Sequence, residues 1–320
     1  MVHNRGEGMD RAEILDNIES LFEKSGFYLS QRCCARPSCF DFAARREKHL
    51  VFVKVQPNIG NIYEKDAEGL AALARFFSGA SLFICEKSRN RPLEDDTVYS
   101  RYGVGAITQA TLENAISNGT GPLIEAGPGG YYVRLDGDAI RERRIQNGFS
   151  IGKMAEILGV SRRTLYGYER GLTKASVSIA YKLGTAWGVP VVKPFDIFKH
   201  PEEAEGVIAA AKRLISGRRF LQFVFKRLLQ FNFAVFQLKG APFDFVAKNP
   251  ETKTNLLGGV ANKKERNLDA RSEEIASLSK VLEARPIFVA DSKVTINKIP
   301  LFCREDFENI KCSEDLMAKL

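Results

Sequence analysis

The chain of 320 residues has no long uninterrupted hydrophobic run. A helix that crosses a bilayer needs about 18 consecutive apolar residues, whereas the most apolar stretch, residues 220–238, is broken by Lys226, Arg227 and several amide side chains. The first eight residues are mostly polar and lack the apolar core of a secretory signal. We therefore expect a soluble, cytoplasmic protein with no membrane partner.

Histidine and cysteine are also scarce, with three and six residues. Cys33, Cys34 and Cys39 lie close together, but they form no CxxC pair, and the nearest histidine, His49, has no partner at ligand spacing. The spread of the cysteines does not match a disulfide framework. We interpret them as small thiols, mostly buried, and expect neither a metal ion nor a cofactor.

Acidic residues are fewer than basic ones, and the formal net charge is +8. Residues 138–199 hold eleven lysines and arginines against five acidic residues, so most of the excess lies in one fifth of the chain. Positive charge concentrated in one compact segment is typical of a surface that binds phosphate groups.

The two ends of the chain follow the same pattern. Cys39-Phe-Asp-Phe near the start has a counterpart in Pro242-Phe-Asp-Phe near the end. Each is followed by an apolar strand, an amphipathic helix and a second apolar strand, expected at residues 50–55, 64–77 and 81–85 and at residues 255–260, 272–282 and 286–290. Strands that alternate with helices predict two duplicated α/β domains.

A glycine-rich segment, Gly127-Pro-Gly-Gly, separates two short apolar runs between the copies. A loop that cradles phosphate requires a helix directly after it, but an apolar strand follows here. The segment therefore predicts a β-hairpin turn. On the other side of the central segment, residues 200–219 are polar and rich in alanine, which indicates a helical connector.

The central segment has the spacing of short amphipathic helices that share one core. Ser150 is placed to cap a helix that ends near Leu158, and Ser161 to cap a second one that ends near Arg170. Gly159 between them suits a tight turn with positive φ. The expected inward-facing residues are Ile140, Ile145, Phe149, Ile151, Met154, Ala155, Leu158, Val160, Leu165, Tyr168, Ile179, Leu183 and Trp187.

Two resemblances follow from these motifs. The stretch from Met154-Ala-Glu-Ile-Leu-Gly-Val-Ser to Tyr168-Glu-Arg-Gly is similar to the helix-turn-helix of the Cro and lambda-repressor type, also called the xenobiotic-response-element family. The whole chain resembles the archaeal family of HTH-type transcriptional regulators, in which such a module lies between nuclease-like flanks. That wider match rests on Cys39-Phe-Asp, Val53-Lys-Val and Ala126-Gly-Pro-Gly-Gly.

The expected fold class is therefore α/β plus all-α. Two duplicated restriction-endonuclease-like α/β domains would flank a central five-helix lambda-repressor-like DNA-binding domain. The predicted domains are a nuclease-like domain at 1–118, a β-hairpin linker at 119–137, the helix-turn-helix domain at 138–199, a helical connector at 200–219 and a degenerate nuclease-like domain at 220–320.

The resemblance also implies roles for individual residues. The first turns of the second helix would enter the major groove with Arg162, Arg163, Thr164 and Tyr166, and arginine can bond bidentately to a guanine edge. The DNA-binding set is completed by the capping residues Ser150 and Ser161 and by expected phosphate contacts at Arg141, Lys153, Arg170 and Lys174.

Two further positions bear on this assignment. In the family, a glutamate like Glu169 pairs with an arginine like Arg144 and fixes one helix against another. Many relatives carry glutamine where this chain has Ile151, so a DNA contact usual at that position is absent. For the arginines, the alternative to DNA contact is an ordinary solvated surface role.

The leading hypothesis is a sequence-specific transcriptional regulator that binds double-stranded DNA as a homodimer and is not an enzyme. The alternative is a metal-dependent DNA nuclease of the PD-(D/E)xK type, with Asp41 and Lys54 in its motif. Against it, Phe52 stands at the acidic position of the motif, so a neighbouring carboxylate such as Glu64 would have to supply the missing metal ligand. The second copy keeps Asp244 but has Gly258 and Gly259 near the positions of the acid and the lysine. A role in binding a partner or an effector is a third possibility.

Overall fold

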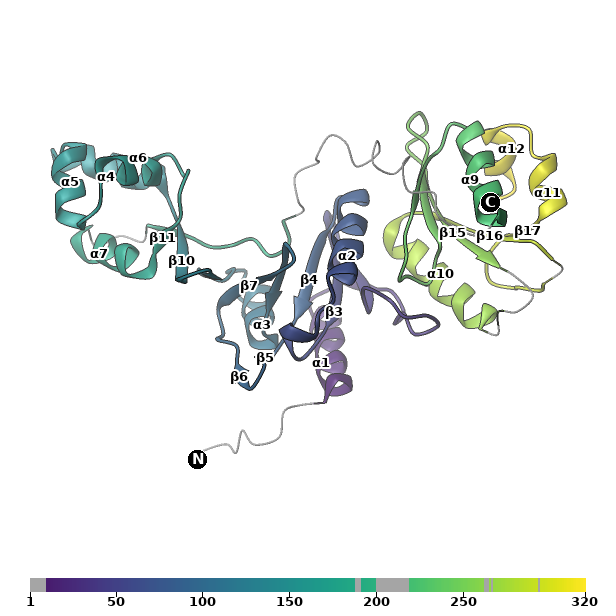
Figure 1. Ribbon diagram of the computed structural model, residues 1–320, viewed down its shortest axis with the longest axis horizontal. Helices are drawn as coiled ribbons and strands as arrows, with labels where there is room; N and C mark the ends of the chain where they lie inside the picture. The colour runs from purple at the N-terminus through teal and green to yellow at the C-terminus, as the bar shows by residue number, and fades with distance from the viewer. Residues whose placement is uncertain (1–9, 188–190, 200–218, 262–264, 266, 293) are drawn as a thin grey trace. The chain divides into compact units, whose positions relative to one another are not determined.

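The structure is a computed structural model that describes residues 10–187, 191–199, 219–261, 265, 267–292 and 294–320 (Figure 1). The described residues form two compact units. The first is drawn from the described residues within 1–55, 62–82 and 198–320, and the second from those within 56–61 and 83–197. No helix in the described part is both long and apolar enough to cross a membrane.

The first unit contains the α/β elements from the start of the chain. They are α1 (Arg11–Lys24), β1 (Tyr28–Leu29), β2 (Phe42–Arg46), β3 (His49–Val55) and α2 (Glu64–Phe76). Strands β1, β2 and β3 pair antiparallel in that order. Strand β3 forms because its run of β-branched and aromatic residues is buried on both faces, from Leu50 to Val53.

The same unit contains the last hundred residues of the chain. They form α9 (Arg219–Gln230), β13 (Ala234–Gln237), β14 (Phe245–Lys248), β15 (Asn255–Ala261), α10 (Leu268–Leu282), β16 (Arg285–Ala290), β17 (Leu301–Cys303), α11 (Arg304–Asn309) and α12 (Ser313–Ala318). The sheet order is β13-β14-β15-β16-β17, with β15, β16 and β17 parallel. Buried aromatic side chains, among them Phe225, Phe245 and Phe307, fill its core.

The strands and helices expected in the two ends of the chain are present in the same order. The segment before β2 contacts α10, since Glu274 accepts the backbone N–H groups of Cys34 and Ala35, each at 2.7 Å. The N–H of Cys39 donates to the carbonyl of Gly240 at 2.8 Å. These contacts join the ends of the chain, while their origin by duplication stays a prediction.

The second unit begins with small strands. They are β5 (Lys87–Ser88), β6 (Arg91–Pro92), β7 (Thr97–Arg101) and β8 (Val104–Ile107), preceded by the short 3-10 helix η1 (Ile59–Asn61) and followed by α3 (Gln109–Ser117). Of strand β4 (Ala80–Ile84), residues 80–82 are assigned to the first unit and residues 83–84 to the second.

The predicted hairpin is confirmed as β9 (Ile124–Gly127) and β10 (Gly130–Leu135). Its turn uses Gly129 and Gly130 at φ 87° and 146°, where other residues would be strained. Strand β9 runs parallel to β7, and β10 pairs with β11 (Ala175–Ser176) and β12 (Val192–Lys193). The hairpin is therefore shared by the α/β and helical parts of this unit, and the domain boundaries given above stay a prediction.

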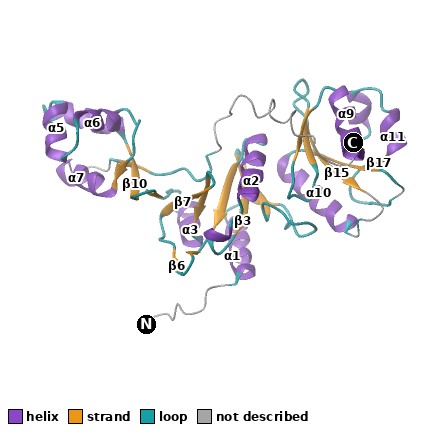
Figure 2. Ribbon diagram, viewed as in Figure 1, coloured by secondary structure: helices purple, strands orange, loops and turns teal. Residues whose placement is uncertain are grey.

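The helical part of the second unit contains α4 (Gly137–Gln146), α5 (Ile151–Leu158), α6 (Arg162–Glu169) and α7 (Val177–Trp187) (Figure 2). Of the five helices expected at 138–199, the described residues show these four. The segment after α7 contributes β12 to the hairpin instead.

Three other expectations have different outcomes. Ile145 was expected in the core but is 58% exposed, because the inward face of α4 carries Ile140 and Arg144, and at 3.6 residues per turn Ile145 lies to the side of that face. The side chain of Trp187 lies outside the described residues. So does the connector expected at 200–219, apart from Arg219, which opens α9.

Candidate nucleic-acid interface

The turn between α5 and α6 is built as the sequence predicts. Ser150 Oγ accepts the N–H of Lys153 at 3.1 Å, and Ser161 Oγ accepts the N–H of Thr164 at 3.0 Å. Gly159 ends α5 in the left-handed region, at φ 71°. Both helix starts and the turn between them are thus fixed by local hydrogen bonds and by one glycine.

One face of each helix is buried against the common core. Ala155, Leu158, Leu165 and Tyr168 are all buried, as predicted, and Val160 is half-buried against them. This packing leaves the opposite face of α6 in contact with solvent.

The predicted pair of Arg144 and Glu169 is confirmed and links α4 to α6. Arg144 Nε donates to Glu169 Oε1 at 2.6 Å and Nη2 donates to Oε2 at 3.1 Å, while Nη1 donates to the carbonyl of Phe149 at 3.0 Å. Both side chains are almost fully buried, and the hydrogen bonds to Glu169 raise the pKa of Arg144 above its usual value. One guanidinium therefore holds both helices and the segment that enters α5.

Gly137, at the start of α4, allows a second close approach of the same helices. A Cβ atom there would lie 2.4 Å from the backbone oxygen of Glu169. Only glycine fits at that distance, because the neighbouring atoms belong to the backbone.

The exposed face of α6 carries Arg162, Arg163 and Tyr166, with Arg170 directly after the helix. Within the described residues, no carboxylate forms an ion pair with any of these arginines. The guanidinium of Arg170 lies 5.1 Å from the ring centroid of Tyr166. Thr164 is half-buried, and its Oγ1 lies 2.8 Å from Ser161 Oγ. This face therefore presents three guanidinium groups and a phenol to solvent, and their contact with DNA stays a prediction.

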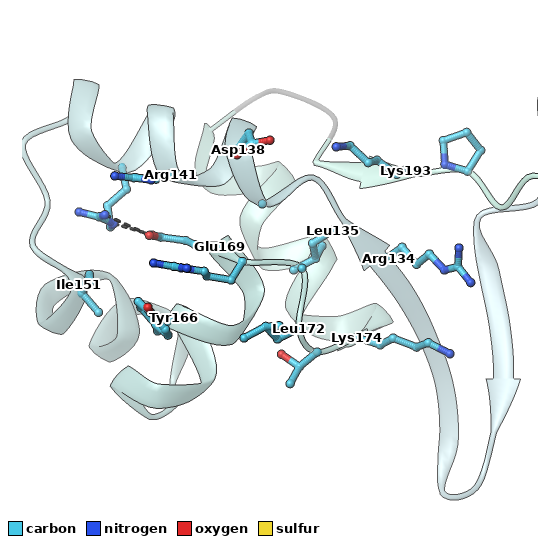
Figure 3. A pocket seen from close by; sticks show the side chains of 16 residues that line it. Arg134, Leu135, Asp138, Arg141, Ile151, Tyr166, Glu169, Leu172, Lys174 and Lys193 are labelled. Atoms are coloured by element: carbon cyan, nitrogen blue, oxygen red, sulfur yellow. Dashed lines mark hydrogen bonds and ion pairs between the residues drawn. The ribbon is translucent and has the colours of Figure 1, made fainter. Parts of the chain in front are cut away.

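A pocket of about 1000 Å³ lies beside this face, between α4 and α6 (Figure 3). We call it the α4–α6 pocket. From the predicted set it brings together Arg141, Tyr166, Arg170 and Lys174. The remaining predicted residues do not line it: Ser150, Lys153, Ser161, Arg162, Arg163 and Thr164.

Two basic residues of this pocket were missed from the sequence. Arg134 comes from β10 and Lys193 from β12, and their strand pairing carries them beside the helices. Ile151, the position where many relatives carry glutamine, also lines the pocket. An alternation of polar and apolar residues along β10 was the only available signal for Arg134.

Three lysines at this surface are already paired with carboxylates. Lys174 Nζ contacts Glu125 of β9, Lys193 Nζ lies 3.1 Å from Asp136, and Lys153 Nζ lies 3.3 Å from Glu156. To contact a phosphate, Lys174 or Lys153 must therefore first give up its carboxylate partner. Among the described residues, the arginines on α6 have no such partner to lose.

The nuclease-like motif in the first copy has a different environment from that of a metal site. Asp41 Oδ1 accepts from Lys54 Nζ at 3.0 Å and from Arg11 Nη2 at 2.7 Å, and Oδ2 accepts the N–H of Val55 at 2.8 Å. Phe52 is fully buried, with its ring 5.6 Å from that of Phe40, whereas Glu64 is exposed. Asp41 is thus a buried carboxylate bound by two cations and a backbone amide.

In the second copy, Asp244 has a similar arrangement. Its carboxylate accepts from the N–H of Val260 at 2.6 Å, from Arg36 at 2.9 Å and from Arg271. At Gly258 and Gly259 of β15, aromatic rings occupy the space that a side chain would need. A Cβ atom at Gly258 would lie 1.9 Å from the ring of Phe245, and one at Gly259 2.7 Å from that of Phe288.

The six cysteines differ in burial. Cys33, Cys39 and Cys85 are buried, Cys303 and Cys312 are half-exposed, and Cys34 is exposed. Burial away from water raises the pKa of Cys39 and of Cys85 to about 12. Within the described residues, no three histidine, cysteine or acidic side chains gather as a metal site would require.

This architecture defines a helix-turn-helix protein with an attached α/β region. Residues 140–193 match the family model described as helix-turn-helix, and residues 11–122 match the model of the PD-(D/E)XK superfamily domain. No solved structure gives a significant match to the chain.

Curated relatives match nearly the full length. Proteins named "Putative HTH-type transcriptional regulatory protein" are 32% identical in Pyrococcus furiosus, over 97% of each chain, and 31% identical in Methanococcoides burtonii, over 95% of this chain and 94% of the relative. One from Thermococcus kodakarensis is 30% identical over 97% of this chain and 95% of the relative. The chain belongs to this archaeal family of HTH-type transcriptional regulatory proteins, which confirms the resemblance noted in the sequence.

Proposed function

We propose that the protein is a sequence-specific transcriptional regulator that binds double-stranded DNA with α6 in the major groove. The observation that carries this proposal is the exposed face of α6, where Arg162, Arg163 and Tyr166 stand without acidic partners while the opposite face is fixed in the core. Residues at the start of a recognition helix are the ones that contact base edges in helix-turn-helix proteins.

Different contacts are assigned to different residues. Arg162 and Arg163 contact base edges, since a guanidinium fits the two acceptors of guanine. Phosphate contacts come from Arg141, Arg170, Lys153 and Lys174, and also from Arg134 and Lys193 at the α4–α6 pocket. The hydroxyl of Ser150 accepts a backbone N–H in its cap and keeps its proton to donate to DNA. Ser161 and Thr164 share one hydrogen bond between their hydroxyls, so one of these two also has a proton to donate.

The domain order given above and a homodimer are part of the same proposal. Each chain contains one helix-turn-helix, and proteins of the Cro and lambda-repressor type bind two half-sites about one helical turn apart. A dimer would therefore protect two such half-sites.

We expect Arg163→Ala to lower the preference for the best site by about 1–3 kcal/mol while binding to random DNA changes little. Lys153→Ala should instead weaken binding to both kinds of DNA alike, because phosphates carry no sequence information. The measurement is a selection from random duplexes with the full chain, followed by titrations and footprints of the selected site. Equal losses on selected and random DNA for both variants would contradict this assignment.

The second candidate function is a metal-dependent nuclease, favoured by the PD-(D/E)XK match and by the presence of Asp41 and Lys54. A catalytic metal in that fold needs carboxylates free to bind it. Asp41 is instead bound by Arg11 and Lys54, and the acidic position is a core phenylalanine. We propose that this region lacks nuclease chemistry.

We therefore expect the purified chain to leave duplex DNA intact in Mg²⁺ or Mn²⁺ over hours. Asp41→Asn and Lys54→Met should behave as the unmodified chain does in this assay. Cleavage that needs the metal and disappears in either variant would establish the nuclease instead.

A further inference from the structure

A second basic pocket lies in the second unit, and no described residue of α3 to α7 lines it. It has a volume of about 1380 Å³, and we call it the β5–β7 pocket. It is lined by Asn58, Ile59, Gly60, Asn61, Ser88, Arg89, Asn90, Arg91, Leu93, Tyr99, Ser100, Arg101, Ala126, Gly127 and Pro128. The lining includes three arginines and no acidic side chain.

The walls of this pocket are held by backbone pairing. Strands β7 and β9 run parallel, with Val98 opposite Glu125. The residues that follow these two positions, Tyr99 to Arg101 and Ala126 to Pro128, therefore leave the paired region side by side. They form one wall, which ends at the turn of the β9–β10 hairpin.

The opposite wall is the β5–β6 hairpin, which Asn58 fixes in place. Asn58 Oδ1 accepts the N–H groups of Arg89 at 3.2 Å and Gly60 at 3.0 Å, and its Nδ2 donates to the carbonyl of Arg89 at 3.3 Å. Arg89 and Arg91 are exposed on this hairpin. The hairpin therefore presents two guanidinium groups from a backbone that is already ordered.

The third arginine has an unsatisfied donor. Arg101 lies 4.4 Å over the ring of Tyr102 and donates to its hydroxyl at 3.2 Å, while its Nε is buried without a hydrogen-bond partner. In the described part of the chain, no carboxylate forms an ion pair with Arg89, Arg91 or Arg101. The nearby acidic run, residues 94–96, does not line the pocket. Arginines without counter-ions are well suited to bind phosphate oxygens.

We propose that the β5–β7 pocket binds the phosphodiester backbone of the DNA duplex whose adjoining segment is bound by α6. This inference rests on the proposed function. Pro128 lines the β5–β7 pocket and Arg134 the α4–α6 pocket, and both belong to one hairpin. Pro128 lies in the turn and Arg134 in β10, six positions apart, so even a fully extended chain would separate them by at most about 22 Å. This is less than the roughly 34 Å of one helical turn of DNA.

The test uses the full chain and two duplexes that share the site selected by the unmodified protein. One has about 20 base pairs and the other extends the same site by about 10 base pairs on each side. We expect the longer duplex to bind more tightly. The triple change Arg89→Ala, Arg91→Ala, Arg101→Ala should remove this gain and reduce the salt slope on the longer duplex by about 2–3 units.

A matched control removes the same charge elsewhere through Lys280→Ala, Arg285→Ala and Lys311→Ala, three exposed residues of the first unit. The control should retain the gain and the slope. The triple variant should also select the same sequence as the unmodified chain, because α6 is unchanged. If the unmodified chain selects no sequence, the proposed function fails, but a random duplex of the longer length still tests the pocket through the salt slope.

Two results would overturn the proposal. One is a salt slope of the triple variant equal to that of the control on both duplexes. The other is binding of inorganic pyrophosphate or a nucleoside triphosphate that the triple change abolishes while DNA binding stays the same. That second result would identify a site for a free phosphorylated ligand. Circular dichroism spectra of all variants show whether the fold is intact.

Discussion

Replacing Arg271 by alanine should lower the free energy of unfolding by about 3–5 kcal/mol. The side chain is fully buried and its guanidinium contacts both Asp244 and Glu265, the latter at 3.1 Å. It also donates to the carbonyls of Pro242 and Val260. Its removal leaves the buried acceptors with fewer partners and opens a cavity beside the ring of Phe288, which the guanidinium covers at 4.8 Å.

Chemical denaturation followed by circular dichroism measures this effect. Arg304→Ala is the control, because Arg304 also contacts two carboxylates but is about half exposed, so that solvent screens these contacts and only a small change is expected there. Arg271→Met restores much of the volume without the charge. A large recovery in Arg271→Met would show that packing, and not the ionic contacts, accounts for the loss.

Glu169→Ala should destabilise the helical part of the second unit by a similar amount, about 3–5 kcal/mol. The change leaves the guanidinium of Arg144 buried with only the carbonyl of Phe149 as partner. Because this guanidinium joins α4 to α6, both helices should loosen together. A carboxylate beside phosphate groups would be repelled by them, so the loss of DNA binding that follows should be indirect.

Hydrogen exchange of the α6 amides measures this effect locally, which matters because a chain of several units need not unfold in one step. Lys153→Ala breaks the exposed contact with Glu156 and should change exchange by less than about 0.5 kcal/mol. The double change Glu169→Ala, Arg144→Ala should lose less than the sum of the single changes. Strict additivity would mean that the two side chains do not stabilise each other.

The helix caps and the turn of the helix-turn-helix could be predicted because the interactions that form them are short in sequence. Caps at Ser150 and Ser161 and the turn at Gly159 depend on residues within four positions along the chain, so the sequence displays them directly. The pair of Arg144 and Glu169 was found through the family resemblance, since 25 positions separate the partners.

Features that are formed by segments far apart in the sequence could not be predicted from it. The pairing of Lys174 with Glu125 depends on contacts between the hairpin and the helical segment, and the contribution of Lys193 depends on the short strand β12. The β5–β7 pocket combines four separate segments of the chain. No local rule connects such segments, because strand pairing across long loops is set by the whole fold.

The cysteines differ in how readily a reagent in solution can modify them. Alkylating reagents attack the thiolate, and a thiol with a pKa of about 12, such as Cys39 or Cys85, holds almost none at neutral pH. Cys34, in contrast, is exposed and its own backbone amide donates to Glu274 of α10. In a variant that replaces the half-exposed Cys303 and Cys312 by serine, a fluorophore coupled to Cys34 under native conditions would be positioned where the first and last segments of the chain meet.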